Sequence, residues 1–457
     1  MGHEVVGASM PFAPPAAGEV VVYRGATLID GTGGPARPST TVVVDGSGIS
    51  AVVADAQLPD ADLPEGASVV DLTGQFVIPG LIDSHQHLAT PPDRAAAEAV
   101  LRRQVYGGIT AIRDMADDLR QVGDLARATR VGELPGPDIR YAALMAGPSF
   151  FADPRTWQVS QGETPGAVPW MQAITDETDL PLAVALARGT HAQAIKIYAN
   201  LPGRTVAAIT AEAHRQGIDV WAHAAVFPAS PGEVVRAGAD SVSHVHLLVH
   251  DLAADRLTTY QEKPPVDHQR FAAGDDPQIE SLLTEMRQRG TVLDATASLW
   301  TSDEVLAGAD QETLERARVN SDLSAQLTAQ AHRAGVDISA GSDYETDPKH
   351  PFPALHLELA FLVRRCGLST AQAIRSATLV GARSMGAEDV MGTLEAGKLA
   401  NFVVLTRDPL VDIANLDSIR FTVKRGRRHD RTDFTDHDDF TDHDDHHDRD
   451  AKDRAER

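Results

Sequence analysis

The stretch that decides the fold is VIPGLIDSHQHL, residues Val77 to Leu88. An apolar run closes on Pro-Gly, and His85 and His87 follow with one residue between them. In a strand, residues i and i+2 face the same side, so both imidazoles can be directed to one point. Two interpretations are open here: the histidines form the polar end of a buried strand, or they are half of a metal site. The HxH pattern cannot choose between them without the rest of the chain.

Length and composition restrict the class of protein. The chain has 457 residues, a length that fits a large barrel plus a smaller domain. Its net charge of −24 argues against a nucleic-acid partner. No apolar run is long enough for a membrane helix, which needs roughly 18 to 20 residues, so no membrane partner is expected. The N-terminus lacks a basic region followed by an apolar core, so no secretory signal is predicted. The single cysteine, Cys366, excludes an internal disulfide, and together these features favour a cytoplasmic protein.

Three composition regimes follow one another along the chain. Residues 19–75 hold short β-branched segments separated by Gly, Asp and Pro, and β character returns over residues 386–428. Between them, residues 76–385 alternate short apolar runs with Ala-, Arg- and Glu-rich helical stretches, and eight strand candidates can be counted. We therefore expect an α/β fold: a (β/α)₈ TIM-like barrel with a small β-sandwich domain built from the N- and C-terminal segments.

The two ends of the chain look different from these domains. Residues 1–18 are rich in Pro and Ala and are predicted to form a flexible arm. Residues 429–457 contain a nearly duplicated FTDHDD and almost no apolar side chains, so a disordered His/Asp-rich tail is predicted. Such a tail could bind divalent metal loosely, but a solvated tail is the favoured interpretation.

Further chemically active residues stand at the ends of other predicted strands. His223 closes IDVWAH, His244 closes ADSVSH, Lys196 lies within AIKIY, and Asp343 follows ISAGS. Each one alone is more often a loop residue, a solvated lysine or a helix N-cap. The C-terminal ends of barrel strands converge on one face, however, and enzymes with this fold carry out their chemistry there. Their shared position therefore favours a common site with His85 and His87.

The ordered motifs FVIPGLIDSHQH, GITAIRD, AIKIY, AHRQGIDVWAHA, AGADSVSH, AGVDISAGSD and GTLEAGKLANFVVL resemble the metal-dependent amidohydrolase superfamily, specifically its imidazolonepropionase-like and Xaa-Pro-dipeptidase-like branch. The resemblance covers nearly everything from about residue 20 to 427. It implies two divalent metal ions in the barrel. The site residues that it implies are His85 and His87 with Asp343 at the more buried ion, His223 and His244 at the second, and Lys196 as a bridging carbamate formed with carbon dioxide.

The chemistry of these side chains is consistent with the implied site. A free ammonium repels a cation, whereas a lysine carbamate offers two anionic oxygens to two metals. Four imidazoles and two carboxylate-like groups suit zinc. A metal-bridging hydroxide would attack the carbonyl, and Asp343 would carry the proton to the departing nitrogen. We therefore expect a metal-dependent amidohydrolase that cleaves a C–N amide or peptide bond in a small or peptide-derived substrate.

Two alternatives remain open. The same binuclear centre could serve an esterase, lactonase or phosphotriesterase. The chain could also be a catalytically silent metal-binding protein, although a mere metal holder would not need Asp343 as a proton carrier. A serine nucleophile is disfavoured because no GxSxG elbow is present.

Substrate recognition is expected from aromatic and polar side chains near these motifs. His246 lies on the same strand face as His244, which is preferred as the metal ligand. Tyr198 shares the face of Lys196 and could donate to a substrate oxygen. The remaining candidates come from the long segment after the third barrel strand, where selectivity is expected to reside: Phe150, Phe151, Trp157 and Trp170. Each of these aromatic residues could equally be an ordinary packing residue, and a homo-oligomer is left open.

Overall fold

The computed structural model describes residues 19–347 and 349–434. The predicted arm, and the predicted tail beyond residue 434, lie outside the described residues. Within the described part of the chain, no helix is both long and apolar enough to cross a membrane.

Eight parallel strands form the barrel, and all eight predicted strand segments are present. In chain order and in hydrogen-bonded order they are β6 (Leu81–Gln86), β7 (Ile109–Asp114), β8 (Asp138–Ala146), β11 (Ala194–Ile197), β12 (Asp219–His223), β13 (Ser241–Ser243), β14 (Val292–Asp294) and β15 (Ile338–Ser339). The last strand approaches the first, where Ser84 N donates to Ala340 O at 2.9 Å. The predicted (β/α)₈ barrel is therefore confirmed.

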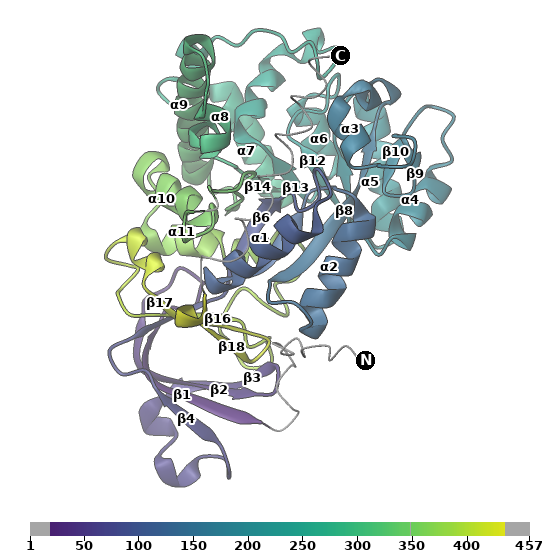
Figure 1. Cartoon of the computed structure of the whole chain (residues 1–457). Coiled ribbons are helices and arrows are strands. Elements are labelled where there is room, and N and C mark those ends of the chain that lie inside the picture. The colour runs from purple at the N-terminus through teal and green to yellow at the C-terminus, as the bar shows by residue number, and fades with distance from the viewer. Residues whose placement is uncertain (1–18, 348, 435–457) are drawn as a thin grey trace, which may run out of the picture.

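Helices cover the outside of the barrel (Figure 1). The main ones are α1 (Arg94–Tyr106), α2 (Leu119–Val131), α4 (Leu180–Gly189), α5 (Gly203–Arg215), α6 (Pro231–Ala237), α7 (Pro277–Arg289), α9 (Gln311–Ala334), α10 (Leu355–Cys366), α11 (Thr370–Ser376) and α12 (Leu379–Arg383). Helix α2 shows why the sequence forms a helix at such a position and packs it on the barrel. Leu119, Val122 and Leu125 bury one face, Asp118 caps the first turn, and Gly132 ends the helix with a φ of 84°.

Strands from both termini form one separate mixed sheet. Its path is β18 (Arg427–Asp430), β17 (Ile419–Lys424), β16 (Phe402–Leu405), β5 (Phe76–Pro79), β1 (Val20–Leu28), β2 (Arg37–Asp45) and β3 (Gly48–Ala54), and β4 (Ser68–Asp71) pairs with β1. In Figure 1 the purple N-terminal and yellow C-terminal strands lie together at one end of the barrel. The predicted β domain from both termini is confirmed.

The β domain has its own core and also packs on the barrel. Tyr23 and Phe402 meet edge to face with ring centres 5.0 Å apart inside the β domain. On the same strand, Val403 and Leu405 belong to the core of the barrel. Because successive residues of a strand face opposite sides, β16 joins the two cores.

Two predicted boundaries need correction. The opening stretch is not one barrel strand, because β5 belongs to the β domain and the barrel begins only at Leu81. The chain crosses between the domains at Gly80: Gly80 N donates to Asn401 O, and Leu81 N donates to Gly108 O. The predicted tail also begins too early, because His429 is buried and lies within β18.

Three shorter segments extend the barrel near the strand ends. After β8 come a 3₁₀ helix η3 (Pro148–Ala152), helix α3 (Pro154–Gln158), and the hairpin of β9 (Ala167–Val168) and β10 (Met171–Ala173). After β13 come the 3₁₀ turns of η4 (Val245–Arg256), and after β14 come η6 (Leu299–Thr301) and α8 (Asp303–Leu306). These segments supply much of the wall of the cavity described next.

Candidate metal centre

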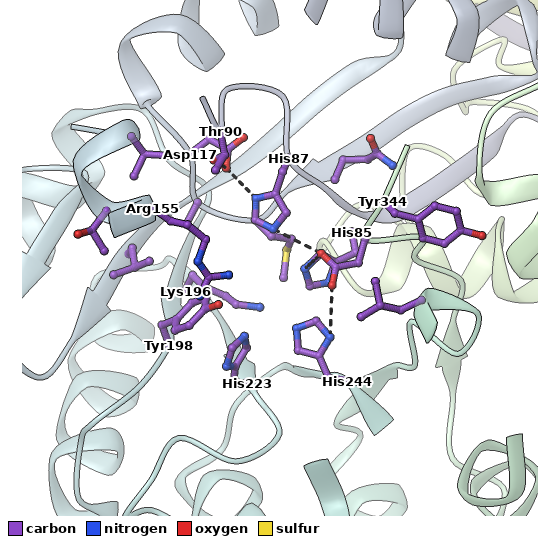
Figure 2. A pocket seen from close by; sticks show the side chains of 18 of the residues that line it. His85, His87, Thr90, Asp117, Arg155, Lys196, Tyr198, His223, His244 and Tyr344 are labelled. Atoms are coloured by element: carbon purple, nitrogen blue, oxygen red, sulfur yellow. Dashed lines mark hydrogen bonds and ion pairs between the residues drawn. The ribbon is translucent and has the colours of Figure 1, made fainter. Parts of the chain in front are cut away.

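The six predicted site residues come from five barrel strands and line one cavity of about 670 Å³. They lie within or just after the strands, at their C-terminal ends: His85, His87, Lys196, His223, His244 and Asp343. Figure 2 shows five of them, with the histidine and lysine side chains directed into a common space. The convergence expected from their strand-end positions is therefore present. Their roles as ligands stay predictions.

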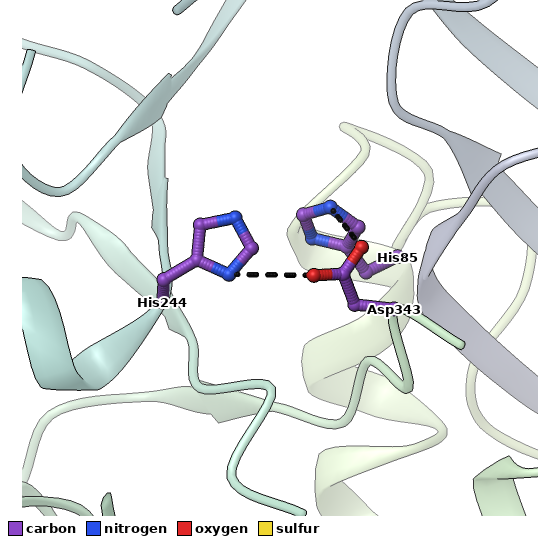
Figure 3. Close-up of side chains that lie close together, drawn as sticks. All are labelled: His85, His244 and Asp343. Carbon is purple, nitrogen blue, oxygen red and sulfur yellow. Dashed lines mark ion pairs between the residues drawn. The ribbon is translucent and has the colours of Figure 1, made fainter. Parts of the chain in front are cut away.

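Three of these residues form a compact group. The ligand atoms of His85, His244 and Asp343 all lie within 4.8 Å of one another. Asp343 Oδ1 is 3.3 Å from His85 Nε2, and its Oδ2 is 3.6 Å from His244 Nδ1 (Figure 3). Oδ1 is also 3.5 Å from His87 Nε2. Asp343 thus reaches three imidazoles at once.

The backbone around Asp343 is shaped for this approach. Asp343 has a φ of 63°, a left-handed conformation that costs a non-glycine residue about 1–3 kcal/mol. Its backbone N–H donates to His85 O at 2.9 Å. Two residues earlier, a Cβ on Gly341 would collide with Asp294 and His85, so glycine is required for the close packing. The carboxylate is therefore held in place by a strained and tightly packed turn.

His85 is oriented by a carboxylate that sequence reasoning missed. Asp294, at the end of β14, is fully buried and its Oδ2 lies 2.7 Å from His85 Nδ1. The same oxygen accepts from Ser243 Oγ at 2.8 Å and lies 3.1 Å from Arg113 Nη2. With Nδ1–H donated to Asp294, the Nε2 lone pair of His85 is directed to the cavity. A usable signal existed, because Asp294 also stands at a strand end in GTVLDATAS.

His87 has an equivalent partner. Asp117 Oδ1 lies 2.7 Å from His87 Nδ1 and accepts from Thr90 Oγ1 at 2.6 Å, while Oδ2 accepts from Ala89 N at 2.6 Å. Burial lowers the pKa of His87, but the Asp117 carboxylate outweighs it, and the pKa rises to about 9. His87 therefore carries a proton at neutral pH unless a metal ion displaces it.

The other three histidines are neutral. Burial, and then the Lys196 charge, hold the pKa values of His85 and His223 well below the usual range. Burial and then the charge of His85 do the same for the pKa of His244. His223 Nδ1 is buried and accepts no hydrogen bond from the described residues. Neutral imidazoles with lone pairs beside an aspartate are the donor set of a zinc-type ion, so the residues fit divalent metal.

Lys196 occupies the floor of the cavity. It is buried on β11, and its Nζ donates to Ser243 Oγ at 3.3 Å. Burial lowers the pKa of Lys196 to about 7, although Asp294 acts in the opposite direction. A substantial fraction of the side chain is therefore an uncharged amine at neutral pH, which is the form that can react with an electrophile.

The structure separates the predicted substrate-binding residues. Phe150, Tyr198 and His246 line the cavity. Phe151 instead packs behind Phe150 in an edge-to-face contact and is not part of the wall. The two tryptophans of this segment, Trp157 and Trp170, do not line it either: the first is exposed, and the second is buried with its indole N–H donated to Val159 O. The lining residues that sequence reasoning missed include Arg155, Tyr260, Lys263 and Trp300.

Comparison with known proteins agrees with this architecture. The sequence model of the Amidohydrolase family matches residues 76–428. The imidazolonepropionase of Micrococcus luteus is 25% identical over 391 residues, covering 78% of this chain and 86% of that protein. The ochratoxinase of Aspergillus niger is 26% identical over 418 residues, covering 86% and 82%.

A solved structure shows the same fold. The crystal structure of a Xaa-Pro dipeptidase with bound methionine in the active site superimposes with a TM-score of 0.70 at 21% identity, covering 90% of this chain and 100% of that one. The family match, the parallel barrel and the His/Asp group at its C-terminal face agree with one another. The chain belongs to the Amidohydrolase family, metal-dependent hydrolases that act on carbon–nitrogen bonds.

Proposed function

We propose that this chain hydrolyses the C–N bond of an amide or peptide in a small or peptide-derived substrate. The observation that carries the proposal is the convergence of two neutral imidazoles and the Asp343 carboxylate within 4.8 Å, at the catalytic face of the barrel. The relatives named imidazolonepropionase and ochratoxinase support a small-molecule substrate.

Six side chains would hold two divalent ions, most suitably zinc. His85, His87 and Asp343 would bind one ion, and His223 and His244 would bind the second. When bound, such ions lower the pKa of water and polarise a carbonyl group. Asp294 and Asp117 would keep the Nδ1 protons of His85 and His87 in place, so that both rings present Nε2 to the cavity.

Lys196 would join the two ion positions as a carbamate. Its amine, with a pKa of about 7, is available to attack carbon dioxide without first being stripped of a proton by a strong base. The nitrogen would form a bond to the carbon of carbon dioxide and release one proton to solvent. The product is an anion with two oxygens, which removes the repulsion between an ammonium and the metal ions. Carbamate formation would therefore turn the Lys196 side chain on the cavity floor into an anionic ligand.

Asp343 would move the proton during hydrolysis. Water adds to the carbonyl carbon, and the C–N bond then breaks. Asp343 accepts the proton of the attacking water and delivers it to the departing nitrogen, so that an amine leaves in place of an amide anion. Its left-handed turn and its contacts to three histidines keep the carboxylate beside the reacting group.

A substrate screen tests this proposal. The protein, supplied with zinc and bicarbonate, should hydrolyse members of a panel of dipeptides, N-acyl amino acids and cyclic amides. Activity should disappear on chelation and return with zinc. Asp343→Asn should lower kcat by about 10²- to 10⁴-fold, with metal content followed by elemental analysis. Turnover of esters, lactones or phosphotriesters without any amide turnover would contradict the proposal, as would substoichiometric metal after chelator-free purification.

A further inference from the structure

Two cationic side chains line the cavity on segments outside the metal centre. Arg155 belongs to α3, and Lys263 follows η4; both are exposed. Arg155 donates through Nε and Nη2 to Asp153 at 3.1 and 2.8 Å, and its Nη1 has no hydrogen-bond partner among the described residues. Lys263 Nζ lies 3.7 Å from the ring centre of Tyr260 and forms no ion pair with any described carboxylate. Both side chains therefore retain capacity to bind an anion.

The charges of the cavity come from different strand ends. The carboxylates in its wall are Asp117, Asp343 and Glu345, which follow β7 and β15. Arg155 and Lys263 follow β8 and β13, which stand between β7 and β15 in the strand order of the barrel. Burial, and then repulsion by the charge of Arg155, lower the pKa of Lys263. An anion bound between them would remove that repulsion.

A single residue positions both cationic segments relative to Lys196. Asn200 stands four residues after Lys196, just beyond β11. Its Nδ2 donates to Ser149 Oγ at 3.0 Å, on the segment that carries Arg155, and to Gln261 Oε1 at 3.1 Å, on the segment that carries Lys263. Its Oδ1 accepts from Tyr260 N at 2.8 Å. The cations are therefore tied to the strand that carries the floor of the metal centre.

An aromatic wall connects the cations to the metal centre. Tyr260, under the Lys263 ammonium, lies 5.7 Å from Tyr198, measured between ring centres. Tyr198 in turn lies 4.5 Å from Phe150 and 3.9 Å from the His223 ring. Figure 2 shows Tyr198 and Arg155 on the same side of the cavity as His223 and Lys196. A flat or apolar group can pack on this wall while its ends reach different charges.

We propose that the substrate is an amide with a free carboxylate, an N-acyl amino acid or a peptide with its C-terminus free, and that Arg155 and Lys263 bind this carboxylate. This inference rests on the proposed hydrolysis of an amide. It assigns an orientation: the carboxylate lies between the two cations, the side chain packs on Tyr198 and Phe150, and the scissile amide lies beside Asp343. Arg155 and Lys263 are then specificity-determining residues that take no part in proton transfer.

Matched substrate pairs test the assignment. N-acetyl-L-phenylalanine and its C-terminal carboxamide differ in the charge of one group, so the ratio of their kcat/KM values reports recognition of the carboxylate. We expect the wild type to favour the acid by about 10- to 100-fold, the range given by a charge-assisted hydrogen bond. Arg155→Gln and Lys263→Gln should each reduce this ratio, chiefly by raising KM for the acid, and Lys263→Arg should retain it. The matched control is Arg204→Gln, which changes an exposed arginine of α5 that pairs with Asp176 and should leave the ratio unchanged.

A binding measurement separates this inference from the proposed function. Calorimetry on the metal-loaded wild type should show tighter binding of L-phenylalanine than of L-phenylalaninamide, and this preference should disappear in the Arg155→Gln, Lys263→Gln double variant. Equal binding of acid and amide, with equal turnover of both substrates, would overturn the carboxylate site while leaving amide hydrolysis intact. A preserved binding preference without any amide turnover would instead overturn the proposed function and leave the carboxylate site standing.

Discussion

Asp294 connects the histidine that starts the site to the barrel core. It contacts His85, Ser243 and Arg113, and Arg113 in turn lies over the Trp221 ring at 4.7 Å. Burial raises the pKa of Asp294, whereas the Arg113 charge and the hydrogen bond from Ser243 stabilise its ionised form. Asp294 is not among the residues that line the cavity, so it acts by positioning His85.

Asp294→Asn should weaken metal binding by about 10- to 100-fold, the usual cost of losing a group that orients a ligand histidine. The amide keeps the size of the side chain but removes the charge that holds the Nδ1 proton of His85 and balances buried Arg113. Competition with a chelator measures the affinity. Asp322→Asn, on the exposed face of α9, is the control. Unchanged metal affinity in Asp294→Asn would show that His85 is oriented without this carboxylate.

At the scale of residues, the sequence predicts donors better than their partners. His85, His87, Lys196, His223, His244 and Asp343 can be found because each stands at a strand end in a familiar motif. Asp294 also stands at a strand end, but it lies 209 positions from His85, and the strand-end position does not say which histidine it contacts. Arg155 and Lys263 were missed for the same reason, because their approach depends on how two irregular segments fold over the barrel rim. Phe150 and Phe151 are adjacent, and only the turn geometry of η3 decides which one reaches the cavity.

Among the elements, the segment after β14 is held by a buried glutamate on α10. Glu358 Oε1 accepts from Ala297 N at 2.9 Å, and its Oε2 accepts from Ser298 N at 2.7 Å. The same segment carries Thr296, whose Oγ1 lies 3.0 Å from His244 Nδ1. Helix α10 thus fixes a turn that contacts the candidate metal centre.

Glu358 should make the stability of the protein depend on pH. Burial raises its pKa to about 7 in the folded state, against 4.5 for the ordinary side chain. Between these values the folded state binds the proton more tightly, so stability falls as pH rises. From pH 5 to pH 8 the wild type should lose about 2 to 3 kcal/mol relative to Glu358→Gln.

Urea unfolding of both proteins at several pH values measures this difference, because titration of all other groups largely cancels. Glu315→Gln, at an exposed position on α9, should show no such pH-dependent difference from the wild type. A Glu358→Gln curve parallel to that of the wild type would mean that Glu358 titrates alike in the folded and unfolded states.

At the scale of elements, all eight barrel strands could be predicted because short apolar runs alternate with helical stretches. The ends of strands were less certain. The apolar residues on the two sides of Pro79-Gly80 look alike, so the sequence does not show that β5 and β6 belong to different sheets. His429 was placed in a polar tail because its neighbours are charged, yet it pairs opposite Thr422 and is buried beside Tyr106. Burial there comes from the barrel, which no local pattern reveals.

The whole molecule is joined where the chain crosses from the β domain to the barrel. Gly80 bonds to the β domain through Asn401, and the next residue bonds to the barrel through Gly108. A Cβ at Gly80 would collide with the Thr110 side chain. The crossing therefore depends on close contact between the Gly80 backbone and the Thr110 side chain, which the absence of a Cβ at Gly80 permits.

Gly80→Ala should destabilise the protein by about 1–3 kcal/mol, the range for overpacking a buried contact. Thr110→Ala removes two of the three colliding atoms, so the double variant should recover part of this loss. Thermal or urea unfolding measures both. A control is Gly189→Ala, at the end of α4, where an added Cβ meets nothing within 4 Å. Additive effects of Gly80→Ala and Thr110→Ala would contradict the proposed collision.

Asn200 has a consequence for how this scaffold could change its substrate. Because one side chain holds the segments of Arg155 and Lys263 together, neither segment could be exchanged alone without putting its hydrogen bond to Asn200 at risk. The six metal-centre positions lie within or just after the strands, outside the two segments, and would be left untouched by such an exchange. The two segments and Asn200 therefore form a transplantable unit, and a chimaera with a related barrel should inherit a new selectivity only when all three parts are moved together.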